Sequence, residues 1–365
     1  MEIKAAVVHA RQASFSIESV QLSEPRSGQI LVKIVSCGVC HTDEAARQGS
    51  FPMAMPVVLG HEGSGIVEQV GAGVSGIHPG DHVVLSFPSC GRCVNCLSGR
   101  PNLCLQTVPL CFMGRFEDGT TPLSCDGASI SNFFGQSSFA TYAVVDARGV
   151  VPVDKSIDLR LLGPLGCGFS TGAGVVINAF HPRPGDSIVV FGTGSVGMAA
   201  IMAAKACGCT KIIAVDIVES RLQTAKTVGA THVLNSKEVP DIAAQVRQIT
   251  GGAGAEFALD TTGVVSCIRA ANLSIRWGGR AGGVCPNLHV EVDNWDGWFA
   301  GKQWNNFVEG DAIPQLFIPR LIELYQNGLF PIDQLITFYP FHEINQAFED
   351  SHSGKVIKPV LLMEI

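Results

Sequence analysis

Four cysteines lie close together in the segment CGRCVNCLSGRPNLC. Cys90, Cys93, Cys96 and Cys104 are separated by two, two and seven residues. Thiolates at this density suit a tetrahedral Zn²⁺ site closed by four protein ligands, which stabilises a fold and leaves no position for a substrate. An iron–sulfur cluster is the competing interpretation, but the seven-residue gap and the lack of a proline after the last cysteine differ from the bacterial ferredoxin pattern. We therefore predict a structural zinc site here.

A glycine-rich turn joins an apolar strand, SIVVF, to an alanine-rich helix, and its sequence is GTGSVG at 192–197. Gly192 permits a tight turn, Gly194 lets backbone amides approach a pyrophosphate, and Gly197 allows close packing at the helix N-terminus. Asp216 ends the next predicted strand. A carboxylate at that place binds the ribose hydroxyls of the adenosine half and repels a 2′-phosphate, so the sequence predicts NAD rather than NADP.

Three short segments carry further zinc-binding residue types but are far apart in the chain. They are CHTD at 40–43, GHE at 60–62 and GCG at 166–168. Thiolate and imidazole are common protein ligands of Zn²⁺. Each of these residues alone is equally compatible with a buried thiol or a hydrogen-bonded core histidine, so their spacing does not establish that they meet.

The order of predicted elements indicates how these groups are positioned. Up to about residue 150 short apolar strands are separated by Gly and Pro turns, whereas from about 165 apolar strands alternate with helical segments. The second pattern is typical of βαβ units and hence of a doubly wound parallel sheet. From about 305 two helices and a final strand resemble a continuation of the first half. We predict an α/β protein whose domains are 1–165, continued by 305–365, and 166–304.

The composition excludes several classes of protein. The 25 Lys and Arg against 32 Asp and Glu give a net charge of −7, which disfavours nucleic acid as a partner. Thirteen cysteines with no export signal after Met1 predict a reducing, cytoplasmic location in which clustered cysteines bind metal. The uncharged run 161–182 is interrupted by five glycines and by Pro164, so we predict buried segments and no membrane span.

The motifs together resemble those of zinc-dependent medium-chain alcohol dehydrogenases over essentially the whole chain. The resemblance implies a Rossmann sheet that binds the nucleotide and a β-rich, GroES-like catalytic domain. It also implies that Cys40, His61 and Cys167 bind a catalytic zinc, which leaves the fourth position for water or substrate. The segments that carry it, in family order, are GVCHTD at 38–43, GHEGSGIV at 60–67, the four-cysteine loop, GCGFSTG at 166–172 and GTGSVG at 192–197.

The resemblance extends to the residues around the catalytic zinc and the cofactor. Glu62 matches a carboxylate that serves as an alternate zinc ligand, and Asp43 matches the acid that orients the ligating histidine. Thr42 matches the hydroxyl that takes the alcohol proton. His41 and Lys358 stand where the family often has Arg in contact with the pyrophosphate. The expected cofactor-binding residues are His41, Thr171, Gly192, Gly194, Ser195, Val196, Gly197, Asp216, Arg221 and Lys358.

The implied reaction is the reversible oxidation of a primary alcohol to its aldehyde by hydride transfer to NAD, with two zinc ions per chain, one catalytic and one structural. Ala45 replaces a histidine that passes the proton to solvent in liver-type members, so the relay must end at water or at His41. Family members form homodimers or homotetramers, and we expect the same here.

The stretch 308–341 resembles the aryl-alcohol, or benzyl alcohol, branch, whose substrates are aromatic or allylic alcohols. Phe87 is a candidate wall of the substrate pocket, although a core position is the simpler interpretation. Glu309 and Asp311 similarly fit a solvated acidic loop. Aliphatic or terpene alcohols remain alternative substrates, and a non-catalytic, NAD-binding zinc scaffold is the alternative of another class.

Overall fold

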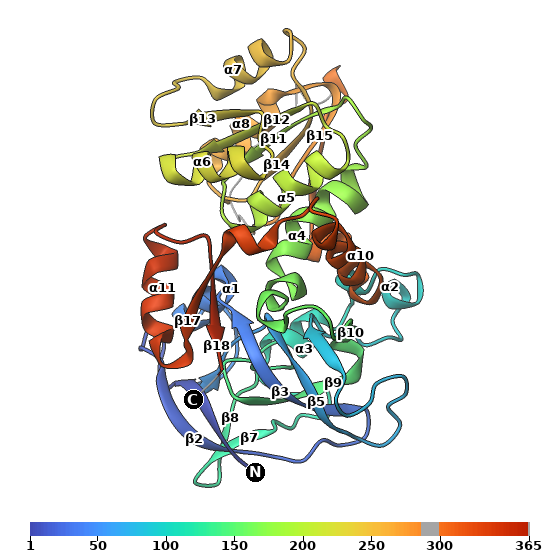
Figure 1. The fold of residues 1–365 in the computed structure, drawn as a ribbon, viewed down its shortest axis with the longest axis vertical. Coiled ribbons are helices and arrows are strands. Elements are labelled where there is room, and N and C mark those ends of the chain that lie inside the picture. The colour runs from blue at the N-terminus through green and yellow to red at the C-terminus, as the bar shows by residue number, and fades with distance from the viewer. Residues whose placement is uncertain (286–298, 364–365) are drawn as a thin grey trace. The chain divides into compact units, whose positions relative to one another are not determined.

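The computed structural model describes residues 1–285 and 299–363, and the chain divides into two compact units. Unit 1 comprises Met1–Cys167, Ile313–Pro319 and Asp333–Ile365. Unit 2 comprises Gly168–Ala312 and Arg320–Ile332. The sheets belong to one unit or the other, and many of their strands are labelled in Figure 1.

Unit 1 is built mainly of antiparallel strands that bury one set of alternating apolar side chains. Its sheets have the orders β4-β1-β2-β7-β8 and β10-β6-β5-β3-β18-β17, with β9 also pairing β3. The C-terminal strand β18 lies beside β3, from the first part of the chain (Figure 1). The strands are β1 (Glu2–Val8), β2 (Ser16–Leu22), β3 (Gln29–Gly38), β4 (Val57–Val58), β5 (Gly63–Val70), β6 (His82–Leu85), β7 (Leu123–Cys125), β8 (Ala128–Ile130), β9 (Tyr142–Asp146), β10 (Val150–Val153), β17 (Ile336–Pro340) and β18 (Lys358–Leu362).

Short helices connect these strands and carry several of the predicted site residues. The α-helices of unit 1 are α1 (His41–Gln48), α2 (Val94–Leu97), α3 (Thr107–Phe112) and α11 (Ile344–His352). Single 3₁₀ turns span Pro101–Leu103, Ala147–Gly149, Leu159–Leu161, Gly163–Gly166 and Phe341–Glu343. The chain passes from unit 1 to unit 2 within helix α10 (Pro314–Gln326), between Pro319 and Arg320. It returns to unit 1 within the turn Ile332–Leu335, between Ile332 and Asp333.

Unit 2 contains a six-stranded sheet in which all neighbouring strands are parallel. Its order is β13-β12-β11-β14-β15-β16, which is the doubly wound order of nucleotide-binding sheets. The strands are β11 (Ser187–Phe191), β12 (Lys211–Asp216), β13 (His232–Asn235), β14 (Ala255–Asp260), β15 (Ile275–Gly283) and β16 (Gln303–Asn306). The helices are α4 (Gly168–Gly174), a π-helix at Val175–Phe180, α5 (Ser195–Ala206), α6 (Glu219–Val228), α7 (Ile242–Ile249) and α8 (Val265–Ser274), and a 3₁₀ turn spans Glu309–Asp311.

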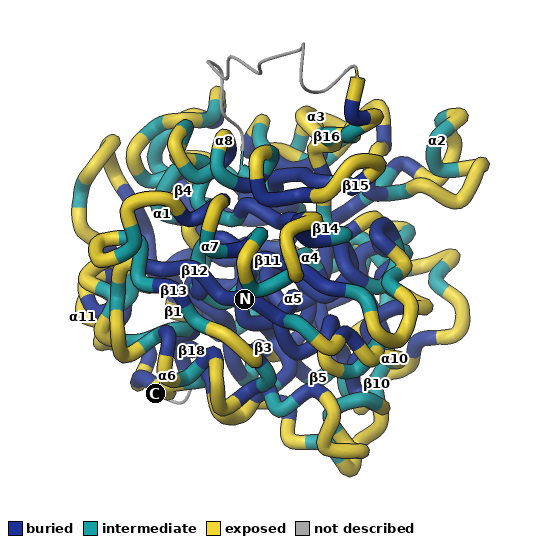
Figure 2. The backbone as a smooth tube through the Cα atoms, turned by 90° about the horizontal axis from the view of Figure 1, so that it is seen from above, coloured by how far each residue is buried: buried dark blue, intermediate teal, exposed yellow. Residues whose placement is uncertain are grey.

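The predicted fold class is confirmed, and burial explains the unusually low charge of the sequence. Strands β11, β12 and β14 run through the interior, where the tube is dark blue in Figure 2. A parallel sheet buried on both faces needs nearly continuous apolar strands, as SIVVF and KIIAV are. Among the described residues, no helix combines the length and the apolar character needed to cross a membrane.

Candidate active site

Cys40, His61, Glu62 and Cys167 meet within unit 1. One possible ligand atom of each lies within 4.8 Å of those of the other three. His61 Nε2 is buried and makes no hydrogen bond to any described residue, whereas Nδ1 lies 2.9 Å from Asp43 Oδ1. A hydrogen bond from Cys167 holds the pKa of Cys40 well below its usual range, although burial opposes ionisation. Thiolates and a free imidazole nitrogen are preferred ligands of Zn²⁺, so these residues fit the predicted ion.

Glycines allow the ligand-bearing segments to approach one another. A Cβ on Gly163 would lie 2.3 Å from the carbonyl oxygen of Glu62, and one on Gly166 would lie 2.0 Å from that of Leu85. A side chain at either position would therefore push the turn Gly163–Gly166 away from Glu62 and from strand β6, which contains Leu85. Because the turn lies directly on them, the residue that follows it, Cys167, reaches the other ligands.

Asp43 connects two of the ligand-bearing segments through one carboxylate. It is fully buried in the first turn of α1. Oδ1 accepts a hydrogen bond from the Gly60 amide at 3.0 Å as well as contacting the His61 ring, and Oδ2 accepts one from the Cys40 amide at 3.1 Å. The neighbouring Thr42 hydroxyl lies 3.8 Å from Cys40 Sγ. This geometry suits a residue that orients the metal-binding histidine.

Lys358 forms a buried ion pair with Glu62. Its Nζ lies 2.9 Å and 3.1 Å from the two carboxylate oxygens of Glu62 and 3.1 Å from the carbonyl oxygen of Val39. Both charged side chains are at most 1% exposed. Three acceptors thus surround the ammonium group, and the pyrophosphate contact of Lys358 stays a prediction. Burial raises the pKa of Glu62, and the Lys358 charge opposes that effect.

The four cysteines of the 90–104 segment form a second cluster in unit 1. Their sulfur atoms lie within 4.8 Å of one another. Backbone amides point at the sulfurs: the Cys90 amide lies 3.2 Å from Cys104 Sγ, and the Cys93 amide lies 3.3 Å from Cys90 Sγ. Amides of Cys96 and Leu105 lower the pKa of Cys93 to about 6. The Cys93 thiolate is therefore favoured, and four sulfur atoms this close together fit a four-coordinate zinc ion.

The phosphate loop of unit 2 has the conformation that its glycines permit. Gly192 has a φ of 87°, and a Cβ on Gly197 would lie 1.9 Å from the Gly192 carbonyl oxygen. A Cβ on Gly194 would meet no described atom within 4 Å, which leaves open space at the N-terminus of α5. Asp216 Oδ2 accepts hydrogen bonds of 2.6 Å from both the amide and the hydroxyl of Thr193. Loop, helix terminus and carboxylate thus meet and fit a dinucleotide.

The remaining predicted cofactor residues lie in both units. Ser195 and Val196 begin α5, and a Cβ on Gly172 would lie 1.9 Å from the Val196 carbonyl oxygen, so Thr171 on α4 lies beside this helix terminus. Arg221 lies on α6, which follows the strand that ends at Asp216. His41 is the exposed first residue of α1 in unit 1.

Comparison with known proteins agrees with this chemistry. Residues 26–155 match the family model of the alcohol dehydrogenase GroES-like domain, and residues 195–292 match that of the zinc-binding dehydrogenases. The chain is 43% identical over 364 residues to geraniol dehydrogenase from Castellaniella defragrans, with 98% of this chain and 97% of that protein covered. This chain belongs to the zinc-dependent medium-chain alcohol dehydrogenases.

Two crystal structures share the whole fold of this alcohol dehydrogenase. An alcohol dehydrogenase zinc-binding domain protein from Burkholderia ambifaria is 45% identical, with a TM-score of 0.98. Benzyl alcohol dehydrogenase from Acinetobacter calcoaceticus is 43% identical, with a TM-score of 0.96. Each comparison covers 100% of both chains. The predicted family is therefore confirmed.

An aromatic cluster that the sequence did not reveal adjoins the metal-binding residues of the dehydrogenase. The His61 ring centroid lies 4.7 Å from that of Phe134 and 5.6 Å from that of Phe133. Phe112 contacts both of these rings and stacks on Phe51, with centroids 4.2 Å apart. The adjacent pair at 133–134 was a visible signal, but only the fold brings it to His61. Phe87, named from the sequence as a candidate pocket wall, is buried in the same hydrophobic core as Phe133 and Phe134.

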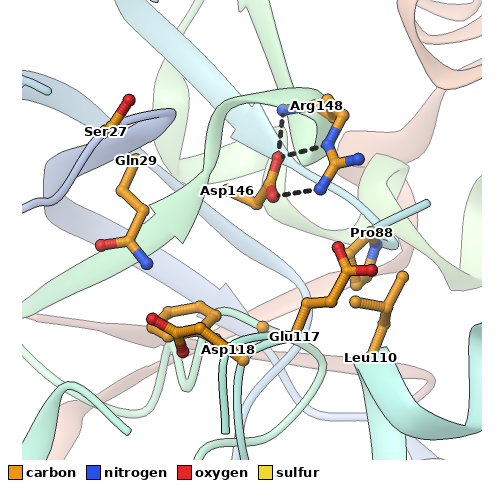
Figure 3. A pocket seen from close by; sticks show the side chains of 10 residues that line it. Ser27, Gln29, Pro88, Leu110, Glu117, Asp118, Asp146 and Arg148 are labelled. Carbon is orange, nitrogen blue, oxygen red and sulfur yellow. Dashed lines mark hydrogen bonds and ion pairs between the residues drawn. The ribbon is translucent and has the colours of Figure 1, made fainter. Parts of the chain in front are cut away.

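A pocket of about 210 Å³ lies beside the four-cysteine loop of the dehydrogenase and is lined by charged side chains (Figure 3). Asp146 binds Arg148 through two parallel contacts, and Arg148 also donates to the Cys90 carbonyl oxygen. Glu117 and Asp118, also in the lining, pair with arginines outside it. Arg148 and Glu117 thus connect the lining of this pocket to the four-cysteine loop, through the Cys90 carbonyl oxygen and Arg92.

Proposed function

We propose that this dehydrogenase oxidises primary aromatic or allylic alcohols, of the benzyl alcohol type, to aldehydes with NAD, and that the reaction is reversible. The observation that carries the proposal is the aromatic cluster around His61. Offset or edge-to-face contacts with Phe133, Phe134, Phe112 and Phe51 would favour a flat, conjugated substrate over a short aliphatic one. The relatives named for geraniol, an allylic terpene alcohol, and for benzyl alcohol support the same substrate class.

In the proposed mechanism Cys40, His61 and Cys167 hold the catalytic zinc. The metal supplies a Lewis acid that lowers the pKa of the alcohol, and NAD supplies the hydride acceptor. Asp43 accepts a hydrogen bond from His61 Nδ1–H, which leaves the lone pair of Nε2 for the metal. Thr42 receives the alcohol proton at Oγ1, which lies 3.8 Å from Cys40 Sγ, and passes its own hydroxyl proton on to water or His41. Glu62, held by Lys358, is the alternate ligand.

The identity of the cofactor follows in this proposal from Asp216. Its Oδ2 accepts two hydrogen bonds from Thr193, and its Oδ1 accepts hydrogen bonds from the amides of Ile217 and Val218. These bonds fix the Asp216 carboxylate where the adenosine ribose would bind, so a 2′-phosphate would be repelled. Arg221 and His41 complete the proposed cofactor contacts.

We further propose that unit 1 is the catalytic domain and unit 2 the nucleotide-binding domain, with one catalytic and one structural zinc per chain. The ligands of the structural ion are the four cysteines of the 90–104 segment. Homodimers or homotetramers in the cytoplasm are the expected state of the enzyme, as the family resemblance implies.

The test is a screen of NADH formation, followed by absorbance, with benzyl alcohol, cinnamyl alcohol, geraniol, ethanol and hexanol. We expect kcat/KM for the conjugated alcohols to exceed that for ethanol by about 100-fold. Phe134→Ala should lower kcat/KM for benzyl alcohol about tenfold because a ring contact is lost, and should change that for ethanol much less. Phe338→Ala, which alters a partly exposed ring on β17, is the matched control.

Higher activity with ethanol or hexanol than with the conjugated alcohols would contradict the substrate class. An equal effect of Phe134→Ala on all five alcohols would contradict the role of the aromatic cluster. If no alcohol yields NADH from the zinc-loaded protein, the non-catalytic scaffold becomes the better hypothesis.

A further inference from the structure

The segment Glu309–Asp311 in unit 2 has three consecutive residues in the left-handed region of backbone conformation. The φ angles of Glu309, Gly310 and Asp311 are 50°, 62° and 49°. L-residues other than glycine are strained there, and such residues persist only where their surroundings enforce the conformation. Asp311 is exposed and Glu309 is half-buried, so the segment combines an acidic surface with a strained backbone.

Backbone packing against α4 and the π-helix enforces this conformation. A Cβ on Gly310 would lie 2.3 Å from the Ser170 carbonyl oxygen, and a Cβ on Gly174 would lie 2.2 Å from the Gly310 carbonyl oxygen. The side chain of Asn178 also donates to the Gly310 carbonyl oxygen, at 3.1 Å. These contacts fix the segment on the helix that begins unit 2.

The packing brings Glu309 to the side chain of Thr171. Thr171 Oγ1 donates a hydrogen bond of 3.4 Å to Glu309 Oε2. An ionised carboxylate only accepts hydrogen bonds, so Thr171 donates its single hydroxyl proton to Glu309. The lone pairs of the Thr171 oxygen are then left to accept hydrogen bonds. The next residue, Gly172, is in backbone contact with Val196 at the start of α5, where the phosphate loop ends.

We propose that Glu309 is a positioning residue that makes the Thr171 hydroxyl a hydrogen-bond acceptor for an N–H or O–H group of the bound dinucleotide. This inference rests on the proposed NAD function. The strained backbone of Glu309–Asp311 keeps the carboxylate in place before the cofactor arrives, so the acceptor is oriented in advance and less ordering is required on binding.

The experiment is a fluorescence titration of NADH, without alcohol, against the zinc-loaded protein and its variants. We expect Glu309→Ala and Thr171→Val each to raise the Kd for NADH about tenfold. The double variant should bind no more weakly than Thr171→Val alone, because Glu309 acts through that hydroxyl. Glu309→Gln should restore part of the affinity, since its amide oxygen still accepts. Asp311→Asn, in the same strained segment, is the matched control and should leave the Kd within twofold.

An unchanged Kd in both Glu309 variants, or losses that add in the double variant, would overturn the proposal. A purely structural role of Glu309 predicts that additive result together with a lower Tm, so thermal unfolding is followed for every variant. If Glu309→Ala does not fold, Glu309→Gln and Thr171→Val still form the comparison. Failure of the wild-type protein to bind NADH would instead contradict the proposed function.

Discussion

Lys358 is a buried cation paired with Glu62. It is fully buried, and its charge is balanced by Glu62 alone among the carboxylates within hydrogen-bonding distance of Nζ in the described residues. Replacing it by an apolar side chain of similar length would leave a buried carboxylate without its cation. A charge left in that state is far more destabilising than the loss of a surface pair.

We therefore predict that Lys358→Met lowers the free energy of unfolding by about 3–5 kcal/mol, measured by urea denaturation of the zinc-loaded protein. Lys155→Met is the control, because Lys155 pairs with Asp81 at 3.6 Å and is 61% exposed. This substitution should lower the free energy of unfolding by less than about 1 kcal/mol. Adding Glu62→Gln to Lys358→Met should recover part of the stability. Equal losses in the two lysine variants would refute this argument.

At the residue scale the sequence was informative where chemistry depends on residue type. The cysteines and His61 were identified from their motifs, and the fold brings them together in two clusters. The Lys358 contact could not be predicted, because its partner is 296 residues away and only the pairing of β18 with β3 brings the two together. The phenylalanines around His61 were hidden for the same reason, since aromatic residues in a sequence are usually interpreted as core.

At the element scale, helix α11 is tied to strand β17 through Asp350. This carboxylate accepts hydrogen bonds from Lys355 Nζ at 2.8 Å and from the Tyr339 hydroxyl at 2.7 Å. The bond from Lys355, followed by that from Tyr339, lowers the pKa of Asp350 to about 2. A carboxyl in the unfolded chain has a pKa of about 3.9, so folding favours the ionised form.

The sign of the pH effect follows from this lowered pKa. The stabilisation from Asp350 is complete above about pH 4 and is lost as the pH falls through about 2. We predict that Asp350→Asn lowers the Tm at pH 7 and makes the Tm fall less steeply between pH 4 and pH 3 than in the wild-type protein. Asp333→Asn, at an exposed carboxylate, is the control. Identical slopes of Tm against pH for Asp350→Asn and the wild-type protein would contradict the link between the Asp350 carboxylate and stability. Metal release at low pH affects both proteins, so it cancels in the comparison.

Apolar strands and the alanine-rich helix were predicted, whereas helix α1 and the strained segment Glu309–Asp311 were not. Strands β11, β12 and β14 and helix α5 coincide with predicted segments because long apolar runs and an alanine-rich stretch leave few alternatives. Helix α1 was missed because it buries only Asp43 and Ala46 of its eight residues and so lacks an apolar stripe. The left-handed segment Glu309–Asp311 depends on packing against α4, which no local pattern contains.

For the whole molecule, the decisive quantity is the number of zinc ions per chain. The two ligand clusters share no residue, and both are made by unit 1 alone. An enzyme needs the cluster at Cys40, His61 and Cys167, whereas a scaffold stabilised by zinc needs only the four-cysteine loop. Two ions with alcohol-dependent NADH formation support the enzyme, and one ion without turnover supports the scaffold.

Asp43→Asn should separate the two zinc ions. The amide keeps the size of the carboxylate but removes the charge that orients His61 and contacts the Cys40 amide, and losses of such supporting groups typically weaken metal affinity about 10–100-fold. We predict two zinc ions per chain in the wild-type protein by elemental analysis and one in this variant after mild chelation, with NADH formation lost in parallel. The retained ion should be the one at Cys90, Cys93, Cys96 and Cys104. Adding Cys93→Ser to Asp43→Asn checks this assignment, because it should remove the retained ion and lower the Tm. If Asp43→Asn keeps both ions under the same chelation, the carboxylate does not support the site, and the orienting role must belong to the packing of the Gly163–Gly166 turn instead.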